Sequence, residues 1–97
     1  MTYISRNAVV NGICPADFYG SRFARLSRPN PRGWSNTRCI FHDDSTPSLG
    51  VNLQTGAFKC LACGTSGSNI IQFEIERTRG SFADVLRLLV DEWGVIV

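Results

Sequence analysis

The chain has 97 residues, 43% of them hydrophobic and 19% charged, with a formal net charge of +2. No apolar run approaches the ~18 residues that span a bilayer, and the N-terminus lacks the apolar stretch of a signal peptide. We therefore expect one intracellular domain without membrane partners, in which clustered cysteines are more often metal ligands than disulfides.

The charge is divided unevenly along the chain. Residues 1–38 carry +5, residues 39–97 carry −3, and nine of the ten cations are arginine. Such a division suggests a half that faces a polyanion, because the planar guanidinium suits phosphate contacts and stacking on bases. A solvated surface explains the charge alone equally well.

The N-terminal part predicts an arm, a helix and a loop. We expect an arm or strand over residues 1–13 and the domain proper over residues 14–97. Pro15 suits the first position of a helix. The apolar residues that follow at roughly helical spacing are Phe18, Tyr19, Phe23 and Leu26. Residues 27–33 contain two prolines and a glycine, which exclude regular structure.

The middle of the chain predicts a short antiparallel sheet. The expected strands are 34–40, 48–53 and 57–60. The sequence Gln54-Thr55-Gly56 is typical of a hairpin turn between the last two of these strands.

The C-terminal third predicts two helices. Asn69 followed by Gln72 resembles a capping box, and Ser81 with Asp84 three residues later begins a second helix. The second helix carries an apolar stripe of Phe82, Val85, Leu86, Leu89 and Trp93. We therefore expect a small α+β fold, in which one N-terminal helix and two C-terminal helices pack on the short sheet.

Four residues form two pairs with metal-ligand spacing: Cys39 with His42, and Cys60 with Cys63. Each pair lets one tight turn direct two side chains at the same ion, so that three thiolates and one imidazole complete a tetrahedron. Soft sulfur ligands favour Zn²⁺, and four protein ligands leave no open position for water. The sequence predicts one structural zinc ion and no catalytic metal.

The cysteines have other conceivable roles besides zinc binding. A disulfide or redox pair at Cys60 and Cys63 is disfavoured, because no βαβ pattern surrounds these residues. Cys14 is expected to pack as a small hydrophobic residue at the start of a helix.

The residues around the ligands resemble the zinc-binding domain of bacterial and phage DNA primases, the CHC2-type zinc ribbon. The matching segments are CIFHDDSTPSL (39–49), FKCLACG (58–64), GSNIIQF (67–73) and GSFADVL (80–86). Ile40 and Ala62 depart from the proline and glycine that the family prefers. The resemblance implies a zinc ribbon that contacts single-stranded template DNA in primer synthesis. We expect the chain to be either an excised domain of a primase or a stand-alone relative from a plasmid or phage.

The resemblance also implies that polymerase chemistry belongs to a separate catalytic domain. This chain offers no cluster of acidic residues able to hold Mg²⁺, since Asp43-Asp44 and Glu74/Glu76 are too few. We therefore expect no catalytic site of its own.

Proteins that bind single strands combine basic groups for phosphates with aromatic platforms for bases. The candidates for DNA contact are Arg22, Arg25, Arg28, Arg32, Trp34, Arg38 and Lys59. Phe58 also falls in a predicted strand, but we expect it in the core. Arg38 and Lys59 adjoin predicted zinc ligands, so their charge would also offset that of the three thiolates.

Two further interpretations stay open. The chain could dock a primase catalytic domain, a helicase or a replication initiator without touching DNA, and an exposed patch of leucine or isoleucine would favour this. A free-standing redox or metal-handling protein is opposed by four ligands that close the site.

Overall fold

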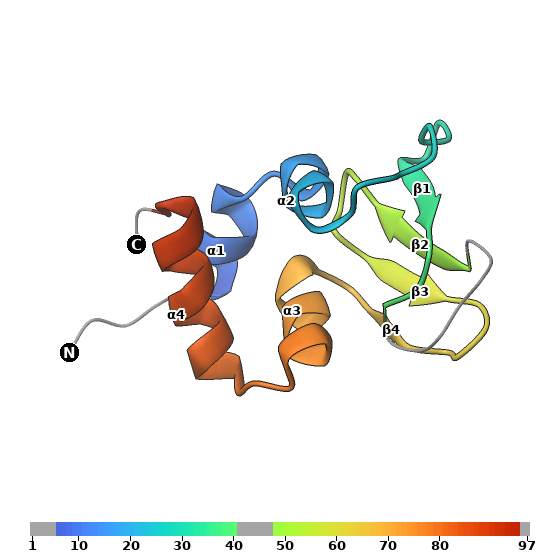
Figure 1. The fold of residues 1–97 in the computed structure, drawn as a ribbon. Coiled ribbons are helices and arrows are strands. Elements are labelled where there is room, and N and C mark those ends of the chain that lie inside the picture. The colour runs from blue at the N-terminus through green and yellow to red at the C-terminus, as the bar shows by residue number, and fades with distance from the viewer. Residues whose placement is uncertain (1–5, 41–47, 96–97) are drawn as a thin grey trace.

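The computed structural model describes residues 6–40 and 48–95, which form four helices and a four-stranded sheet (Figure 1). The helices are α1 (Arg6–Gly12), α2 (Pro15–Arg22), α3 (Ile70–Thr78) and α4 (Phe82–Trp93). The strands are β1 (Trp34–Thr37), β2 (Leu49–Asn52), β3 (Phe58–Cys60) and β4 (Ser66–Gly67). This confirms the small α+β fold. No helix within the described ranges is long and apolar enough to cross a membrane.

The sheet is antiparallel throughout and follows the order of the sequence, β1-β2-β3-β4. The predicted turn between β2 and β3 is confirmed, because the side chain of Asn52 accepts hydrogen bonds at 2.9 Å from the amides of Gln54 and Thr55. Strand β4 was not predicted from the sequence, since a strand of two residues has no visible alternation.

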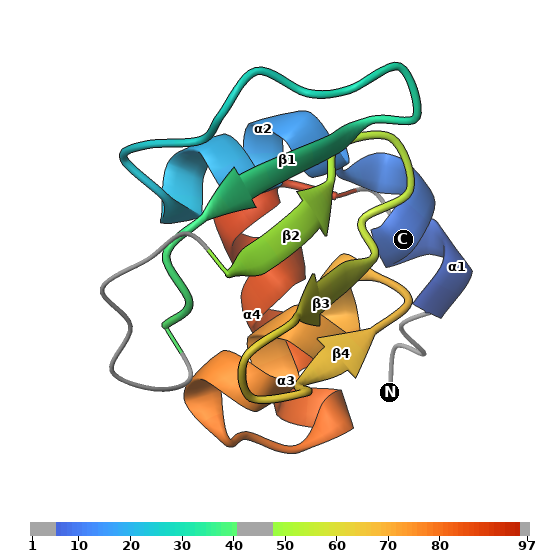
Figure 2. The same ribbon diagram turned by 90° about the vertical axis from the view of Figure 1, so that its right-hand side faces the viewer.

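One face of the sheet is covered by helices and the other is open. Figure 2 looks onto the open face, with α2, α3 and α4 behind the sheet. Leu49, Val51 and Phe58 point toward the helices and are at most 1% exposed. Because side chains alternate along a strand, Asn36 and Lys59 point the opposite way and are exposed.

The core is centred on Phe73 of α3, which is fully buried. Its ring meets those of Phe18, Tyr19, Phe23 and Phe58 nearly edge to face, with ring centroids 5.1 to 5.8 Å apart. Such pairs contribute about 0.5–1.5 kcal/mol each beyond the area they bury. The cluster joins α2, α3 and β3, and it confirms the predicted core position of Phe58.

Residues 6–12 form helix α1 in place of the expected arm or strand. Val9 is fully buried and Ile13 is 2% exposed, and α1 packs on α4. A segment this short is a weak helix alone, so its helical form depends on this packing. Cys14 also differs from the expectation, because it is exposed and does not pack in the core.

The predicted starts of the two C-terminal helices are confirmed. The side chain of Asn69 accepts a hydrogen bond from the Gln72 amide at 3.0 Å, and that of Ser81 accepts one from the Asp84 amide at 3.1 Å. Helix α3 ends at Thr78, and the cap residue Arg79 has a φ of 58°, in the left-handed region.

Helix α4 carries the predicted apolar stripe, with one exception. Val85, Leu86 and Leu89 are buried, and Trp93 packs beside Phe18. Phe82 was expected in the core but is 48% exposed, because the first turn of α4 extends beyond the surface that the stripe covers.

Candidate metal centre

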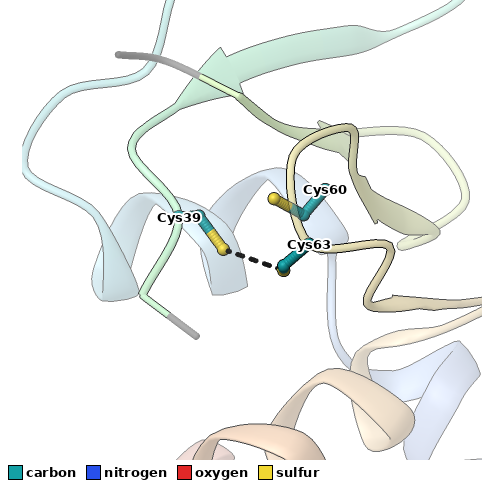
Figure 3. Close-up of side chains that lie close together, drawn as sticks. All are labelled: Cys39, Cys60 and Cys63. Atoms are coloured by element: carbon teal, nitrogen blue, oxygen red, sulfur yellow. Dashed lines mark hydrogen bonds between the residues drawn. The ribbon is translucent and has the colours of Figure 1, made fainter. Parts of the chain in front are cut away.

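Three cysteine sulfurs converge beside the sheet (Figure 3). The Sγ atoms of Cys39, Cys60 and Cys63 all lie within 4.8 Å of one another, and those of Cys39 and Cys63 are 3.9 Å apart. Within residues 6–40 and 48–95, no other group of three or more histidine, cysteine or acidic residues could hold a metal ion.

The register of the sheet brings the cysteines together. Thr37 pairs with Leu49, and Leu49 pairs with Cys60, so the end of β1 and the end of β3 lie at the same edge of the sheet. Cys39 follows Thr37 by two residues and is 5% exposed. This register explains how ligands 21 positions apart in the sequence meet at one point.

A tight turn after β3 adds the third sulfur. The Gly64 amide donates to the Cys60 carbonyl at 2.9 Å, and the Cys60 amide donates to the Thr65 carbonyl at 2.8 Å. Gly64 has a φ of +79°, which a residue with a Cβ adopts only with strain. Ala62 stands where the family prefers glycine, but its φ is not positive, so alanine fits there without strain. Among the described residues other than glycine, only Arg79 has a positive φ.

The surroundings of Cys60 favour its thiolate. Burial by itself raises the pKa of this thiol, but hydrogen bonds from Ser48, from the Cys63 amide and from the Cys39 and Cys63 thiols outweigh burial and lower the pKa to about 6. The Ser48 Oγ lies 3.4 Å from the Cys60 Sγ. A thiolate is the form of cysteine that binds a metal.

The geometry of the sulfurs fits zinc, and no disulfide links the cysteines. Zn–S bonds of about 2.3 Å at tetrahedral angles place two sulfurs about 3.8 Å apart, and the 3.9 Å between Cys39 and Cys63 agrees. A disulfide needs about 2.05 Å, and all four cysteines are free. The cysteine cluster therefore supplies three soft donors for a Zn²⁺ ion. His42, the predicted fourth ligand, lies outside the described residues.

Arg22 was expected to contact DNA, but the structure gives it another role. Its guanidinium forms two hydrogen bonds with Glu74 of α3, at 3.2 and 3.3 Å, and two with Glu92 of α4, at 2.7 and 3.1 Å. It also lies 4.7 Å from the centroid of the Phe18 ring. With its side chain only 13% exposed, Arg22 joins three helices and is not available to a phosphate.

The charge of Glu74 is stabilised in this position. Burial raises the pKa of Glu74, but hydrogen bonds from Arg77 and Arg22 outweigh burial and lower it. Glu74 thus has a structural role, because it pairs with Arg22 of α2 and Arg77 of its own helix.

The remaining candidates for DNA contact lie on the surface. Arg25, Arg28, Arg32, Arg38 and Lys59 are exposed, and Trp34 is half-buried. Of these, Trp34, Arg38 and Lys59 lie close to the open face or to the cysteine cluster. Their contact with DNA stays a prediction.

Two residues of this region were missed in the sequence analysis. Asn36 is exposed, while its neighbours Ser35 and Thr37 are buried. Strict alternation of side chains along residues 34–38 is the signal that could have identified Asn36. Ser48 contacts Cys60, and only the register of the sheet reveals this contact.

The four-stranded ribbon and its cysteine cluster define the chain as a zinc ribbon. The profile of the CHC2 zinc finger matches residues 25–97, so the chain belongs to the CHC2 zinc finger family. The resemblance to primase zinc-binding domains is thereby confirmed, as is the prediction of one structural zinc ion.

Similar proteins agree with this assignment. A DNA primase of Lactococcus lactis is 40% identical over 57 residues, which are 59% of this chain and 9% of that protein. The Gene 58 protein of Mycobacterium phage D29 is 40% identical over 62 residues, 62% of this chain and 46% of that protein. The chain thus spans less than half the length of either relative.

A solved structure shows the same fold. The crystal structure of the Aquifex aeolicus primase, with its zinc-binding and RNA polymerase domains, superposes with a TM-score of 0.78 at 25% identity. The match covers 94% of this chain and 22% of that one. The shared region includes both the sheet and the helices, because nearly the whole chain is covered.

Proposed function

We propose that this chain is a zinc-stabilised module that binds single-stranded template DNA in primer synthesis. The observation that carries the proposal is the open face of the sheet, where the ring of Trp34 lies against Gly50 and Gly50 pairs with the exposed Lys59. The family membership and the primase relatives support a place in DNA replication.

The open face has the composition that single-strand binding requires. The indole of Trp34 lies against Gly50, and a Cβ on that glycine would be 3.4 Å from the ring. Gly50 pairs with Asn36 on one side and with Lys59 on the other. The exposed side chains of Asn36 and Lys59 therefore flank Gly50, which has no side chain of its own. An aromatic ring can stack on a base while Lys59 meets a phosphate.

We further propose that His42 completes the zinc site with Cys39, Cys60 and Cys63. Zinc in structural sites has four protein ligands, and the cysteine cluster supplies three. When bound, the ion fixes the ends of β1 and β3 relative to each other. The chain's own contribution is then to hold Trp34 and Lys59 in one orientation.

The proposal is tested by binding of a fluorescent oligothymidine to the zinc-loaded protein. Trp34→Ala should weaken binding by about 1–3 kcal/mol, the contribution of one stacked base. Trp93→Phe changes the other tryptophan, which packs beside Phe18 between the helices, and should leave binding unchanged. Equal binding by the wild type and Trp34→Ala would contradict a role for the open face.

The dependence of binding on salt gives a second measurement. Affinity should fall linearly on a logarithmic plot against salt concentration, with a slope of about −0.7 for each phosphate contacted. Binding that does not respond to salt would contradict the contacts proposed for the exposed arginines and Lys59.

Docking of a protein partner is the second candidate function. Ile40 is 47% exposed and Leu61 is 81% exposed, and each directly follows a cysteine of the cluster. Exposed apolar side chains of this kind favour a protein contact with a primase catalytic domain, a helicase or a replication initiator. A double variant, Ile40→Ser with Leu61→Ser, should retain DNA binding and lose such a partner in a pull-down with purified replication proteins.

We propose that the module has no catalysis of its own and acts beside a catalytic domain. The match covers 9% of the Lactococcus lactis primase, and the Aquifex aeolicus structure contains an RNA polymerase domain besides its zinc-binding domain. The purified chain should therefore make no primer from nucleoside triphosphates, with or without Mg²⁺, on any single-stranded template.

A further inference from the structure

An open groove of about 760 Å³ runs alongside β1. It is lined by residues 24–27 and 36–38, two neighbouring segments of the chain in space. This volume lies within the range of about 300–1,000 Å³ that is typical of sites for small ligands. The groove adjoins the cysteine cluster, because Arg38 directly precedes Cys39, and it adjoins the open face, because Asn36 pairs with Gly50. No cysteine lines the groove itself.

The walls of the groove are fixed by hydrogen bonds. The Ser27 amide donates to the Asn36 carbonyl at 3.0 Å, and the Thr37 hydroxyl donates to the Arg25 carbonyl at 2.8 Å. The Ser27 hydroxyl accepts a hydrogen bond from the Asn36 amide at 2.9 Å. The hydroxyls of Ser27 and Thr37 are thus committed to the walls, and a ligand would meet mainly the longer side chains.

Those side chains are cationic. Arg25 comes from one of the two lining segments and Arg38 from the other. Both are exposed, and neither forms an ion pair with a described residue. No acidic residue of the described segments lines the groove. By contrast, Arg22, three residues before Arg25, is paired with the carboxylates of Glu74 and Glu92. Of these two arginines, only Arg25 is available to a phosphate.

The rest of the lining adds apolar surface. Ala24 is small and exposed, and Leu26 is half-buried against the core. A ligand that fits must therefore combine an anionic group with an apolar, flat part, and a nucleotide has both. An acidic peptide would satisfy the arginines but would leave Ala24 and Leu26 without a matching group.

We propose that this groove is a nucleotide subsite in which Arg25 and Arg38 bind the phosphate. The inference rests on the proposed function, because it continues the path of a strand across the open face. Trp34, Asn36 and Arg38 alternate along one side of β1 and its extension, so a strand that stacks on Trp34 can reach the groove at Arg38. The phosphate could belong to the strand or to a free nucleotide.

The test follows backbone amide signals by NMR in the zinc-loaded protein. The protein is titrated with an oligothymidine of about eight nucleotides, within the usual site size, and separately with deoxythymidine 5′-monophosphate. We expect the amide signals of Ser27, Asn36 and Thr37 to shift with the oligonucleotide. The double variant Arg25→Gln with Arg38→Gln should abolish these shifts, and its salt slope should be shallower by about 0.7 for each phosphate that the variant no longer binds.

A control removes one positive charge elsewhere. Arg87→Gln removes an exposed arginine from α4, on the other side of the molecule from the open face, and should leave the shifts and the slope as in the wild type. If Arg87→Gln has the same effect as the double variant, net charge and not the groove explains binding, and the proposal is overturned.

The position of the shifts separates this proposal from the proposed function. Shifts at Trp34 and Lys59 without shifts at the groove would overturn the subsite and leave the open face as the binding surface. Shifts at the groove alone would support the subsite and contradict the open face. No shifts anywhere would overturn both. Shifts with the monophosphate assign the groove to a free nucleotide, and shifts with the oligonucleotide alone assign it to a strand.

Discussion

The guanidinium of Arg22 and the carboxylate of Glu74 form a two-pronged ion pair between α2 and α3, with N–O distances of 3.2 and 3.3 Å. The two residues are 52 positions apart in the chain. Their side chains are 13% and 7% exposed, so the pair is largely removed from water. Because Arg22 is bound in this pair, it is not available to a polyanion, whereas the later arginines of residues 1–38 are exposed.

Replacing Glu74 should destabilise the fold. In Glu74→Gln, the charges of Arg22 and Arg77 lose a buried partner, and breaking such a pair from one side costs about 3 kcal/mol. Urea unfolding of the zinc-loaded protein measures this loss. Glu76→Gln, an exposed position on the same helix, should change the free energy of unfolding by less than about 1 kcal/mol. Equal effects of the two substitutions would contradict a structural role for Glu74.

The zinc ligands should differ sharply from the remaining cysteine. Cys60→Ala removes a buried ligand and should abolish stoichiometric zinc binding and cooperative unfolding, because zinc binding supplies much of the folding free energy. Cys14→Ala, at an exposed position, should bind one zinc ion as the wild type does. Metal analysis and far-UV circular dichroism before and after chelation make the comparison. A folded, zinc-free wild type would refute the structural role of the metal.

The cysteine cluster was predictable from the sequence, and the arginine roles were not. Ligand spacing is a local property, so Cys39, Cys60 and Cys63 were identified from the sequence, and the structure brings them together. Arg22 and Arg25 look alike in the sequence, because the acidic partners of Arg22 come from distant segments. Pairing over such separations depends on how the helices pack, which no local pattern encodes.

Tyr19 should make stability depend on alkaline pH. Its hydroxyl is buried and donates to the Gly56 carbonyl at 2.6 Å. Burial, aided by the charge of Glu74, raises the pKa of Tyr19 well above its ordinary value near 10. The folded state therefore keeps the proton while the unfolded state loses it, so this stability is complete below about pH 10 and is lost as the pH rises further.

Tyr19→Phe tests that expectation. Near pH 8 the variant should be less stable by about 1–2 kcal/mol, because the Gly56 carbonyl loses its buried donor. The difference from the wild type should narrow by about 1.4 kcal/mol for each pH unit above 10. Urea unfolding at a series of pH values measures both effects, and a constant difference up to pH 11 would contradict ionisation of Tyr19 on unfolding.

Two glycines should respond in opposite ways to alanine. A Cβ on Gly67 would lie 2.5 Å from Cε1 of Phe58, so Gly67→Ala must displace a core ring and should cost about 1–3 kcal/mol. Nothing lies within 4 Å of a Cβ on Gly20, which is exposed in α2. Gly20→Ala should therefore stabilise the protein by about 0.5–1 kcal/mol. Thermal unfolding of the two variants measures both changes in stability. Stabilisation by Gly67→Ala would contradict the close packing of β4.

Local signals also predicted most of the fold, with errors at its edges. The caps at Asn69 and Ser81 and the turn after Asn52 depend on neighbouring residues, and all three are confirmed. Helix α1 has no such signal, since its form depends on packing against α4. Phe82 was predicted in the core but is exposed. An apolar stripe predicts which side of a helix faces the core, but it does not show at which residue the helix extends past the core.

The packing of the first helix on the last has a practical consequence for handling the protein. Gly12 approaches Val95 so closely that a Cβ on the glycine would lie 2.8 Å from the Cγ1 atom of Val95. Helices α1 and α4 lie at the end of the molecule away from the sheet (Figure 1). A biotin or a bead tethered beyond Val95 would leave from that end. The immobilised protein would then present the ribbon to solution, which suits sensor-chip and single-molecule pulling experiments.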